Sequence, residues 1–171
     1  HPTYPALTPL TTKVTRWTDL SGVSLEAHLT APPETPHYSQ RQGLLFTHRG
    51  LSGPAVLNIA HVFTRPRTGA PPPILAQFGS LGRADWEREF NAGGRVHLAT
   101  AVRRHLPERL ALALLEEARV PGDRPLAQLR REEREAVLVA LTALPLPITG
   151  DEGYRKAEVT GGGVALSEID P

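Results

Sequence analysis

Residues 42–60 read QGLLFTHRGLSGPAVLNIA, and this stretch decides the fold that the sequence predicts. The apolar run 44–46 is typical of a strand, and it stops at the segment Thr47-His48-Arg49-Gly50. An apolar helical pattern begins after this turn, where Ser52 suits the N-cap and Pro54 suits the first helical turn. We therefore expect a strand, a glycine turn and a capped helix that runs to about residue 63.

The predicted turn is also the first candidate for a binding site. A helix N-terminus leaves unpaired N–H groups, which favour an anion, an oxyanion or the polar edge of a cofactor. His48, at the strand end, can donate a hydrogen bond or shuttle a proton near neutral pH. The alternative is a well-capped buried helix without a ligand. A hydrolase site with Ser52 as nucleophile and His48 as base is disfavoured, because the sequence has no GxSxG elbow and no acid placed to orient His48.

Strand patterns flank this stretch, and a helical block separates the last of them from the others. Alternating or short apolar runs predict strands over 10–17, 23–31, 43–47, 74–78 and 146–149. Apolar stripes at helical spacing predict helices from residue 84 onward and over 96–105, 107–120 and 130–144. The prediction is an α+β fold, in which 1–80 and 145–171 form a small antiparallel β-barrel or sheet and 81–144 forms an inserted helical subdomain.

Two proline-rich segments predict irregular structure. Three prolines in 1–10 favour an extended connector that enters the sheet, and the prolines of 31–40 favour an exposed loop.

Composition excludes several kinds of site. The 171 residues include no cysteine, which rules out disulfides, thiolate metal sites, iron–sulfur ligation and a cysteine nucleophile. The seven histidines have none of the spacings of a ligand set, so no metal site is predicted. Because no apolar run is long enough to cross a bilayer and no secretory signal is visible, we expect no membrane partner and a cytoplasmic location.

The charge pattern argues against a nucleic-acid partner. The formal net charge is only +1, and phosphate-tracking surfaces need uncompensated charge. In the segment 130–135 three arginines are interleaved with three glutamates. This pattern is typical of a solvated helix face with internal ion pairs.

A glycine triple at 161–163 is the second candidate for a ligand-facing segment. It matches neither the GxGxxG fingerprint nor a Walker motif, so the chain does not bind a dinucleotide in the usual way. Successive glycines let a backbone approach a ligand or another domain closely. The alternative is a simple turn.

Four sequence blocks cover nearly the whole chain: PALTPL at 5–10, LSGVSL at 20–25, LLFTHRGLSGPA at 44–55, and KAEVTGGGV at 156–164 with EIDP at 168–171. In these blocks the chain resembles the middle portion of the BaiN/YhiN-like flavoproteins, also called the aminoacetone-oxidase-like family. In that family a long insert, part barrel-like and part helical, splits an FAD-binding Rossmann domain. The resemblance implies that this chain is such an insert.

The resemblance carries expectations about chemistry. The parent protein is expected to be an FAD-dependent, NAD(P)-linked oxidoreductase, and this fragment alone to bind no cofactor and to be inactive. The partners implied are the Rossmann domain of the same polypeptide, NAD(P)H and a small-molecule substrate. The segments expected to face the flavin or the substrate are Thr47, His48, Gly50, Ser52 and Gly53 in the turn, with Thr160, Gly161, Gly162 and Gly163 in the loop. His48 is the candidate catalytic residue.

Arg49 departs from the family pattern, which commonly has an apolar or aromatic residue at this position. A guanidinium there favours an anionic substrate or the phosphate of a nicotinamide nucleotide, although a plain surface arginine is the alternative. The sequence leaves two functional hypotheses. The first is the insert domain of an FAD-dependent oxidoreductase that covers the flavin and shapes the substrate pocket. The second is a non-enzymatic module that binds a protein or RNA.

Overall fold

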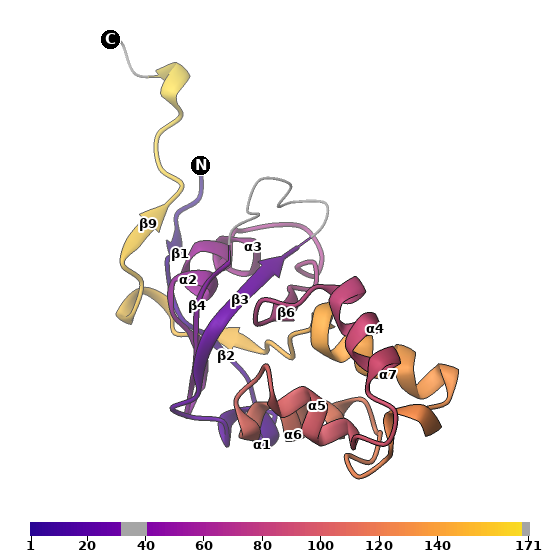
Figure 1. Ribbon diagram of the computed structural model, residues 1–171. Helices are drawn as coiled ribbons and strands as arrows, with labels where there is room; N and C mark the ends of the chain where they lie inside the picture. Colours follow the sequence, from indigo (N-terminus) through magenta and orange to yellow (C-terminus); the bar gives the residue numbers. More distant parts are fainter. Residues whose placement is uncertain (32–40, 169–171) are drawn as a thin grey trace.

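The computed structural model describes residues 1–31 and 41–168 (Figure 1). The loop predicted over 31–40 lies almost wholly outside the described residues, as do residues 169–171 at the end of the final sequence block. In the described part of the chain a curled antiparallel sheet packs against several helices, so the predicted α+β class is confirmed.

The main sheet has seven strands in the described residues, and every neighbouring pair is antiparallel. Their spatial order is β7, β6, β3, β4, β5, β2, β8. Their bounds are β2 Leu10–Thr11, β3 Ser24–Thr30, β4 Gln42–Thr47, β5 Gly50–Ser52, β6 Leu75–Phe78, β7 Leu144–Pro145 and β8 Gly150–Asp151. The strands predicted over 23–31, 43–47 and 74–78 are confirmed as β3, β4 and β6.

A stack of three aromatic rings anchors the inner face of the sheet. Phe46 of β4 and Phe78 of β6 are fully buried, and the short helix α1 (Thr15–Thr18) adds Trp17. The ring centroids of Trp17 and Phe46 lie 6.0 Å apart, and those of Phe46 and Phe78 lie 6.5 Å apart. Because side chains alternate between faces along a strand, this stack fixes which face of β4 and β6 is buried.

Two of the predicted strands are partly wrong. In the stretch 10–17 only β2 is extended, because the chain turns into α1 to bury Trp17. In the stretch 146–149 the chain bridges β7 and β8, held by bonds from Leu146 N–H to the Ile74 carbonyl and from Thr149 N–H to the Thr11 carbonyl.

The helix predicted after the glycine turn is also different in detail. A short strand, β5, lies between the turn and the helix, and it pairs with β4 to make a hairpin. The helix then forms two short pieces, α2 (Pro54–Ile59) and α3 (His61–Thr64), which meet at Ala60. Pro54 does occupy the first turn of α2, as predicted, and α2 packs on β3 and β4.

The helical block lies between β6 and β7 in sequence. It contains α4 (Arg83–Ala92), α5 (Leu98–Arg103), α6 (Glu108–Glu117), the 3₁₀ helix η1 (Leu126–Gln128) and α7 (Arg131–Thr142). The leucine stripes predicted for the third and fourth helices are confirmed, since Leu110, Leu114, Leu138 and Leu141 are buried. Helix α7 also packs on β6, so the helices and the sheet share one hydrophobic core.

Of the internal ion pairs that the charge pattern predicts for 130–135, the structure has the one between Arg130 and Glu133, and Glu133 is buried. The Glu133 carboxylate accepts hydrogen bonds from the Arg130 side chain at 2.9 Å and the Arg130 backbone N–H at 3.0 Å. These bonds lower the pKa of Glu133 and raise that of Arg130. Arg83 of α4 bonds Glu135 in the same way, with the same two directions of pKa shift.

A separate two-stranded ribbon lies beside the main sheet. It pairs β1 (Tyr4–Ala6) with β9 (Val159–Gly161), and the 3₁₀ helices η2 (Gly153–Arg155) and η3 (Leu166–Glu168) flank β9 (Figure 1). The segment 1–10 is therefore partly strand and not only a connector. No helix in the described part of the chain has the length and apolar character that a membrane span needs.

Candidate functional site at the β4–β5 turn

The turn predicted as a binding segment is a tight β-hairpin turn. Thr47 and Gly50 pair across it, and His48 and Arg49 form its tip. The Thr47 hydroxyl accepts hydrogen bonds from the N–H groups of Arg49, at 3.3 Å, and Gly50, at 3.1 Å. Gly50 has φ of +151°, and a Cβ there would overlap the Leu10 carbonyl of β2. Gly50 therefore lets β2 approach the turn, and this fixes the positions of His48 and Arg49.

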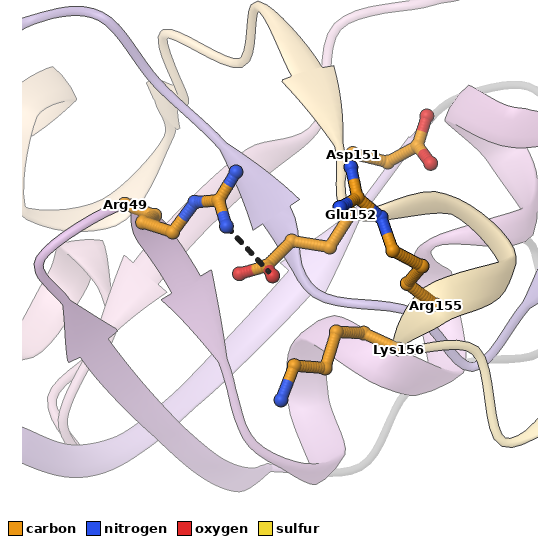
Figure 2. A pocket seen from close by; sticks show the side chains of 5 residues that line it. All are labelled: Arg49, Asp151, Glu152, Arg155 and Lys156. Carbon is orange, nitrogen blue, oxygen red and sulfur yellow. Dashed lines mark ion pairs between the residues drawn. The ribbon is translucent and has the colours of Figure 1, made fainter.

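Strand β2 brings a distant segment beside this turn. It pairs with β5 on one side and with β8 on the other, so the residues after β8 lie next to the hairpin. A cavity of about 420 Å³ results, and its lining comes from Pro9, Thr47, His48, Arg49, Ser52, Glu152 and Lys156. A smaller cavity of about 150 Å³ shares Arg49, Glu152 and Lys156 with it and adds Asp151 and Arg155 (Figure 2). We call these two together the turn cavity.

An ion pair crosses the turn cavity. A guanidinium nitrogen of Arg49 lies 3.5 Å from a carboxylate oxygen of Glu152, and Figure 2 shows the Arg49 side chain, from the hairpin turn, reaching toward that of Glu152, which follows β8. The Arg49 side chain is 57% exposed, whereas that of Glu152 is 12% exposed. The two differ because Glu152 sits against Pro9, to whose carbonyl it donates its own N–H, while Arg49 extends from the hairpin tip.

The remaining charges of the turn cavity are mostly positive. Arg155 and Lys156 are exposed, and no carboxylate in the described residues lies within ion-pair distance of either. The Asp151 carboxylate accepts a hydrogen bond from the Gly153 N–H at 2.7 Å, and this bond stabilises the start of η2. The lining therefore holds three cations, Arg49, Arg155 and Lys156, against two carboxylates, Asp151 and Glu152, which leaves a small excess of positive charge. Such a site attracts anions.

The prediction that Ser52 caps the following helix is wrong. Ser52 is the last residue of β5, where it pairs with Leu45 and lines the turn cavity, and its side chain makes no capping bond. The N-cap is Gly53, with φ of +89°, and a Cβ there would lie 2.7 Å from the Gly43 carbonyl oxygen. The Gly53 carbonyl already accepts the N–H groups of Val56 and Leu57. Fewer free N–H groups therefore face a ligand than the sequence suggested.

The second predicted segment, Thr160 to Gly163, lies elsewhere. Thr160 and Gly161 belong to β9, and Cβ atoms on Gly161 and Gly162 would overlap the Tyr4 ring and the Pro2 carbonyl. These two glycines accommodate the N-terminal strand. Gly162 also lines a cavity of about 320 Å³ with His1, Pro2, Tyr4, Arg65 and Pro66. That cavity shares no residue with the turn cavity, so the structure does not bring the two predicted segments into one cavity.

Sequence reasoning missed Glu152, Arg155 and Lys156 as companions of the turn. Lys156 stands in one of the recognised blocks, but no spacing signal connects residues about a hundred positions apart. Their proximity depends on β2 pairing with both β5 and β8. As for metals, no group of three or more histidine, aspartate or glutamate side chains in the described residues is placed to hold an ion.

Comparisons with known proteins agree on a family. The family model for the HI0933-like protein barrel and H2TH domain matches residues 4–159. The chain is 36% identical over 154 residues to a ribosomal RNA dihydrouridine synthase of Escherichia coli K12, covering 88% of this chain and 36% of the relative. It is 33% identical over 156 residues to a protein of the same name from Haemophilus influenzae, covering 89% and 36%. The chain thus spans about a third of the length of these curated relatives.

Proposed function

We propose, from the premise that this chain belongs to the HI0933-like barrel and H2TH domain family, that it acts as the insert domain of an FAD-dependent oxidoreductase. The family is one of flavoproteins, so the resemblance seen in the sequence is confirmed at that level. The finer role is that the insert covers the flavin and shapes the substrate pocket. The turn cavity is the part of this chain that supports such a role, because it gathers hydrogen-bonding and charged groups from three segments.

The residues of the turn cavity suit a contributing role toward FAD and not the whole of its binding. Arg49, Arg155 and Lys156 can meet phosphate or another anion, and Thr47 and Ser52 present hydroxyl groups. Glycines precede α2 and α4, but no GxGxxG or Walker loop that would hold a pyrophosphate stands between a strand and a helix of the described chain. We therefore propose that the Rossmann domain of the parent protein holds the cofactor and that NAD(P)H reduces it.

We further propose that the substrate is a uridine in ribosomal RNA. The observation that carries this is the name shared by two relatives that match nearly the whole chain. Uridine becomes dihydrouridine when its C5=C6 bond gains a hydride at one carbon and a proton at the other, and a bound, reduced FAD supplies that hydride. We assign to His48 the role of holding or moving the proton, because it lies at the hairpin tip and lines the turn cavity.

This proposal replaces the expectation of no nucleic-acid partner. That expectation used the net charge of the whole chain, but RNA responds to the local charge of the surface it meets. Several arginines on or beside the helices, among them Arg16, Arg83 and Arg130, pair with glutamates, whereas no carboxylate of the described residues pairs with Arg155 or Lys156 at the turn cavity. The alternative of a non-enzymatic RNA-binding module shares the ligand but predicts no reduction of uridine.

We also propose the division into two subdomains, 1–80 with 145–171 and 81–144. Helices α4 to α7 fall within the second part, and all the described strands fall within the first or begin at its boundary. The shared hydrophobic core indicates that the two parts fold as one unit.

The test uses a protein that contains this chain together with the flavin-binding segments. After incubation with NAD(P)H and unmodified ribosomal RNA, nucleoside mass spectrometry should detect dihydrouridine, and the protein should show a flavin spectrum. This chain alone should be colourless and should leave the RNA unmodified. A stoichiometric flavin spectrum from this chain alone would contradict the insert role, and an active, reducible flavoprotein that leaves every uridine unchanged would contradict the substrate.

A further inference from the structure

The turn cavity has a property that the proposed function does not use. One of its arginines, Arg49, extends from the hairpin tip, is more than half exposed, and within the described residues has one ion-pair partner, Glu152. Resting on the proposed function, we propose that the turn cavity is a phosphate subsite, in which Arg49, Arg155 and Lys156 bind the backbone of the RNA strand beside the target uridine. In this arrangement Glu152 is the internal counter-ion that the phosphate replaces.

The geometry of the Arg49–Glu152 pair favours such an exchange. Charge-assisted hydrogen bonds between a guanidinium and a carboxylate are typically about 2.7 to 2.9 Å long. The distance here is 3.5 Å, so the two groups attract each other without a close hydrogen bond. The Arg130 side chain, by contrast, donates a hydrogen bond of 2.9 Å to Glu133, and Arg130 is the N-cap of α7. Arg49 therefore keeps hydrogen-bond donors for an external oxyanion, and a phosphate can satisfy two of them at once.

Neighbouring groups add to the same preference. Lys156 lines both parts of the turn cavity, and Arg155 lines the smaller part, so two further cations lie beside Arg49. The Thr47 hydroxyl already accepts two backbone N–H groups, which holds the hairpin tip in place. A preorganised tip loses little conformational freedom when an anion binds.

Phosphate could reach this subsite from RNA or from the nicotinamide nucleotide, and the observations favour RNA. The cations come from two separate segments along the cavity rather than from one loop that encloses a compact ligand. A polynucleotide strand presents a phosphate at every step and can therefore meet cations on two separate segments. The two sources give different outcomes when RNA binding and nucleotide binding are measured on the same variants.

The experiment measures binding of a fluorescent, uridine-rich, single-stranded RNA oligonucleotide to the full 171-residue chain across a series of salt concentrations. The variants are Arg49→Gln, which removes the central cation, and Glu152→Gln, which removes its counter-ion while keeping the size of the side chain. The matched control is Arg103→Gln. Arg103 also forms an exposed ion pair, at 3.1 Å with Glu108, but it lies on α5 and lines no part of the turn cavity. The KM for NADPH is measured in the flavin-containing protein with the same substitutions.

We expect Arg49→Gln to weaken RNA binding roughly threefold or more and to lower the salt slope by about one. Glu152→Gln should tighten RNA binding, and Arg103→Gln should change neither quantity. The subsite is overturned if Arg49→Gln and Arg103→Gln behave alike or if the unchanged chain does not bind the RNA. If Arg49→Gln raises the KM for NADPH but leaves RNA binding unchanged, the assignment to RNA is overturned. If the variants show all the expected changes in RNA binding but the flavin-containing protein forms no dihydrouridine, the proposed reaction is contradicted and the phosphate subsite is supported.

Discussion

Arg49 at the tip of the β4–β5 hairpin and Glu152 at the end of β8 form an ion pair of 3.5 Å across the turn cavity. Because Arg49 is largely exposed, solvent screens the pair, and we expect it to contribute little to folding. A double-mutant cycle with Arg49→Gln and Glu152→Gln should give a coupling energy below about 1 kcal/mol in urea unfolding. The Arg103–Glu108 pair, measured in the same way, is the control for an exposed pair. A coupling above about 2 kcal/mol would show that Arg49 is a structural residue and not free to bind a ligand.

Gly53 and Gly43 meet where α2 begins, and this contact leads to a second prediction. A Cβ on Gly53 would lie 2.7 Å from the Gly43 carbonyl oxygen, and φ at Gly53 is +89°. We expect Gly53→Ala to lower the free energy of unfolding by about 2 to 3 kcal/mol. Gly94→Ala is the matched control, because Gly94 has φ of +52° but no atom within 4 Å of its Cβ position. The control should lose only about 1 kcal/mol. If both variants lost the same free energy of unfolding, the close contact between Gly53 and Gly43 would contribute nothing to the cost of the substitution.

The strands were predictable from sequence where one face alternates and is buried. Leu44 and Phe46 in β4, and Ala76 and Phe78 in β6, are buried at every second position, and this is the pattern that period-two reasoning detects. Strand β5 was missed because its three residues are too short for any periodicity and are specified by pairing with β2 and β4. The residues Ser52-Gly53-Pro54 are typical of a helix start and predict Ser52 as the cap, but the pairing of β5 with β4 places Ser52 in a strand.

Only the part of the candidate site that lies in the β4–β5 turn was predictable from the sequence. His48, Arg49 and Ser52 come from one continuous stretch whose turn chemistry is visible in the sequence. Glu152 and Lys156 join them through β2, and this pairing involves only two residues, Leu10 and Thr11. Such a short strand gives no sequence signal that it connects two distant segments. For the glycine triple at 161–163 the sequence leaves open a close approach to a ligand or another domain and a simple turn; in the structure the segment packed against Gly161 and Gly162 is the N-terminal one.

Glu133 provides a pH-dependent prediction. Its pKa is lowered, first by the hydrogen bond from the Arg130 side chain and then by that from the Arg130 backbone N–H. A carboxyl whose folded pKa lies below its unfolded value, about 4.3 for glutamate, stabilises the fold above that value. This stabilisation is lost as the pH falls through the folded pKa. The stability difference between the unchanged chain and Glu133→Gln should therefore be constant at neutral pH and should shrink below about pH 4.

The measurement for Glu133 is urea unfolding at a series of pH values. In an Arg130→Gln background the same Glu133→Gln change should have a weaker pH dependence, because the largest cause of the lowered pKa has been removed. If the stability difference between the unchanged chain and Glu133→Gln stayed constant down to the pH at which the protein unfolds, the ionised Glu133 would not stabilise the fold through Arg130.

The last prediction concerns the chemistry of the hairpin. His48 is exposed and Ser52 makes no capping bond, so His48→Ala and Ser52→Ala should each change the free energy of unfolding by less than about 0.5 kcal/mol. In the flavin-containing protein the same changes should lower turnover or weaken substrate binding. If His48 moves the proton of the reaction, His48→Ala should lower kcat by about a hundredfold or more. His97→Ala is the control, since His97 is also exposed but lines neither part of the turn cavity. Unchanged kinetics in both variants would assign the hairpin a purely structural role, because a tip fixed by Thr47 and Gly50 can support the sheet without meeting any ligand.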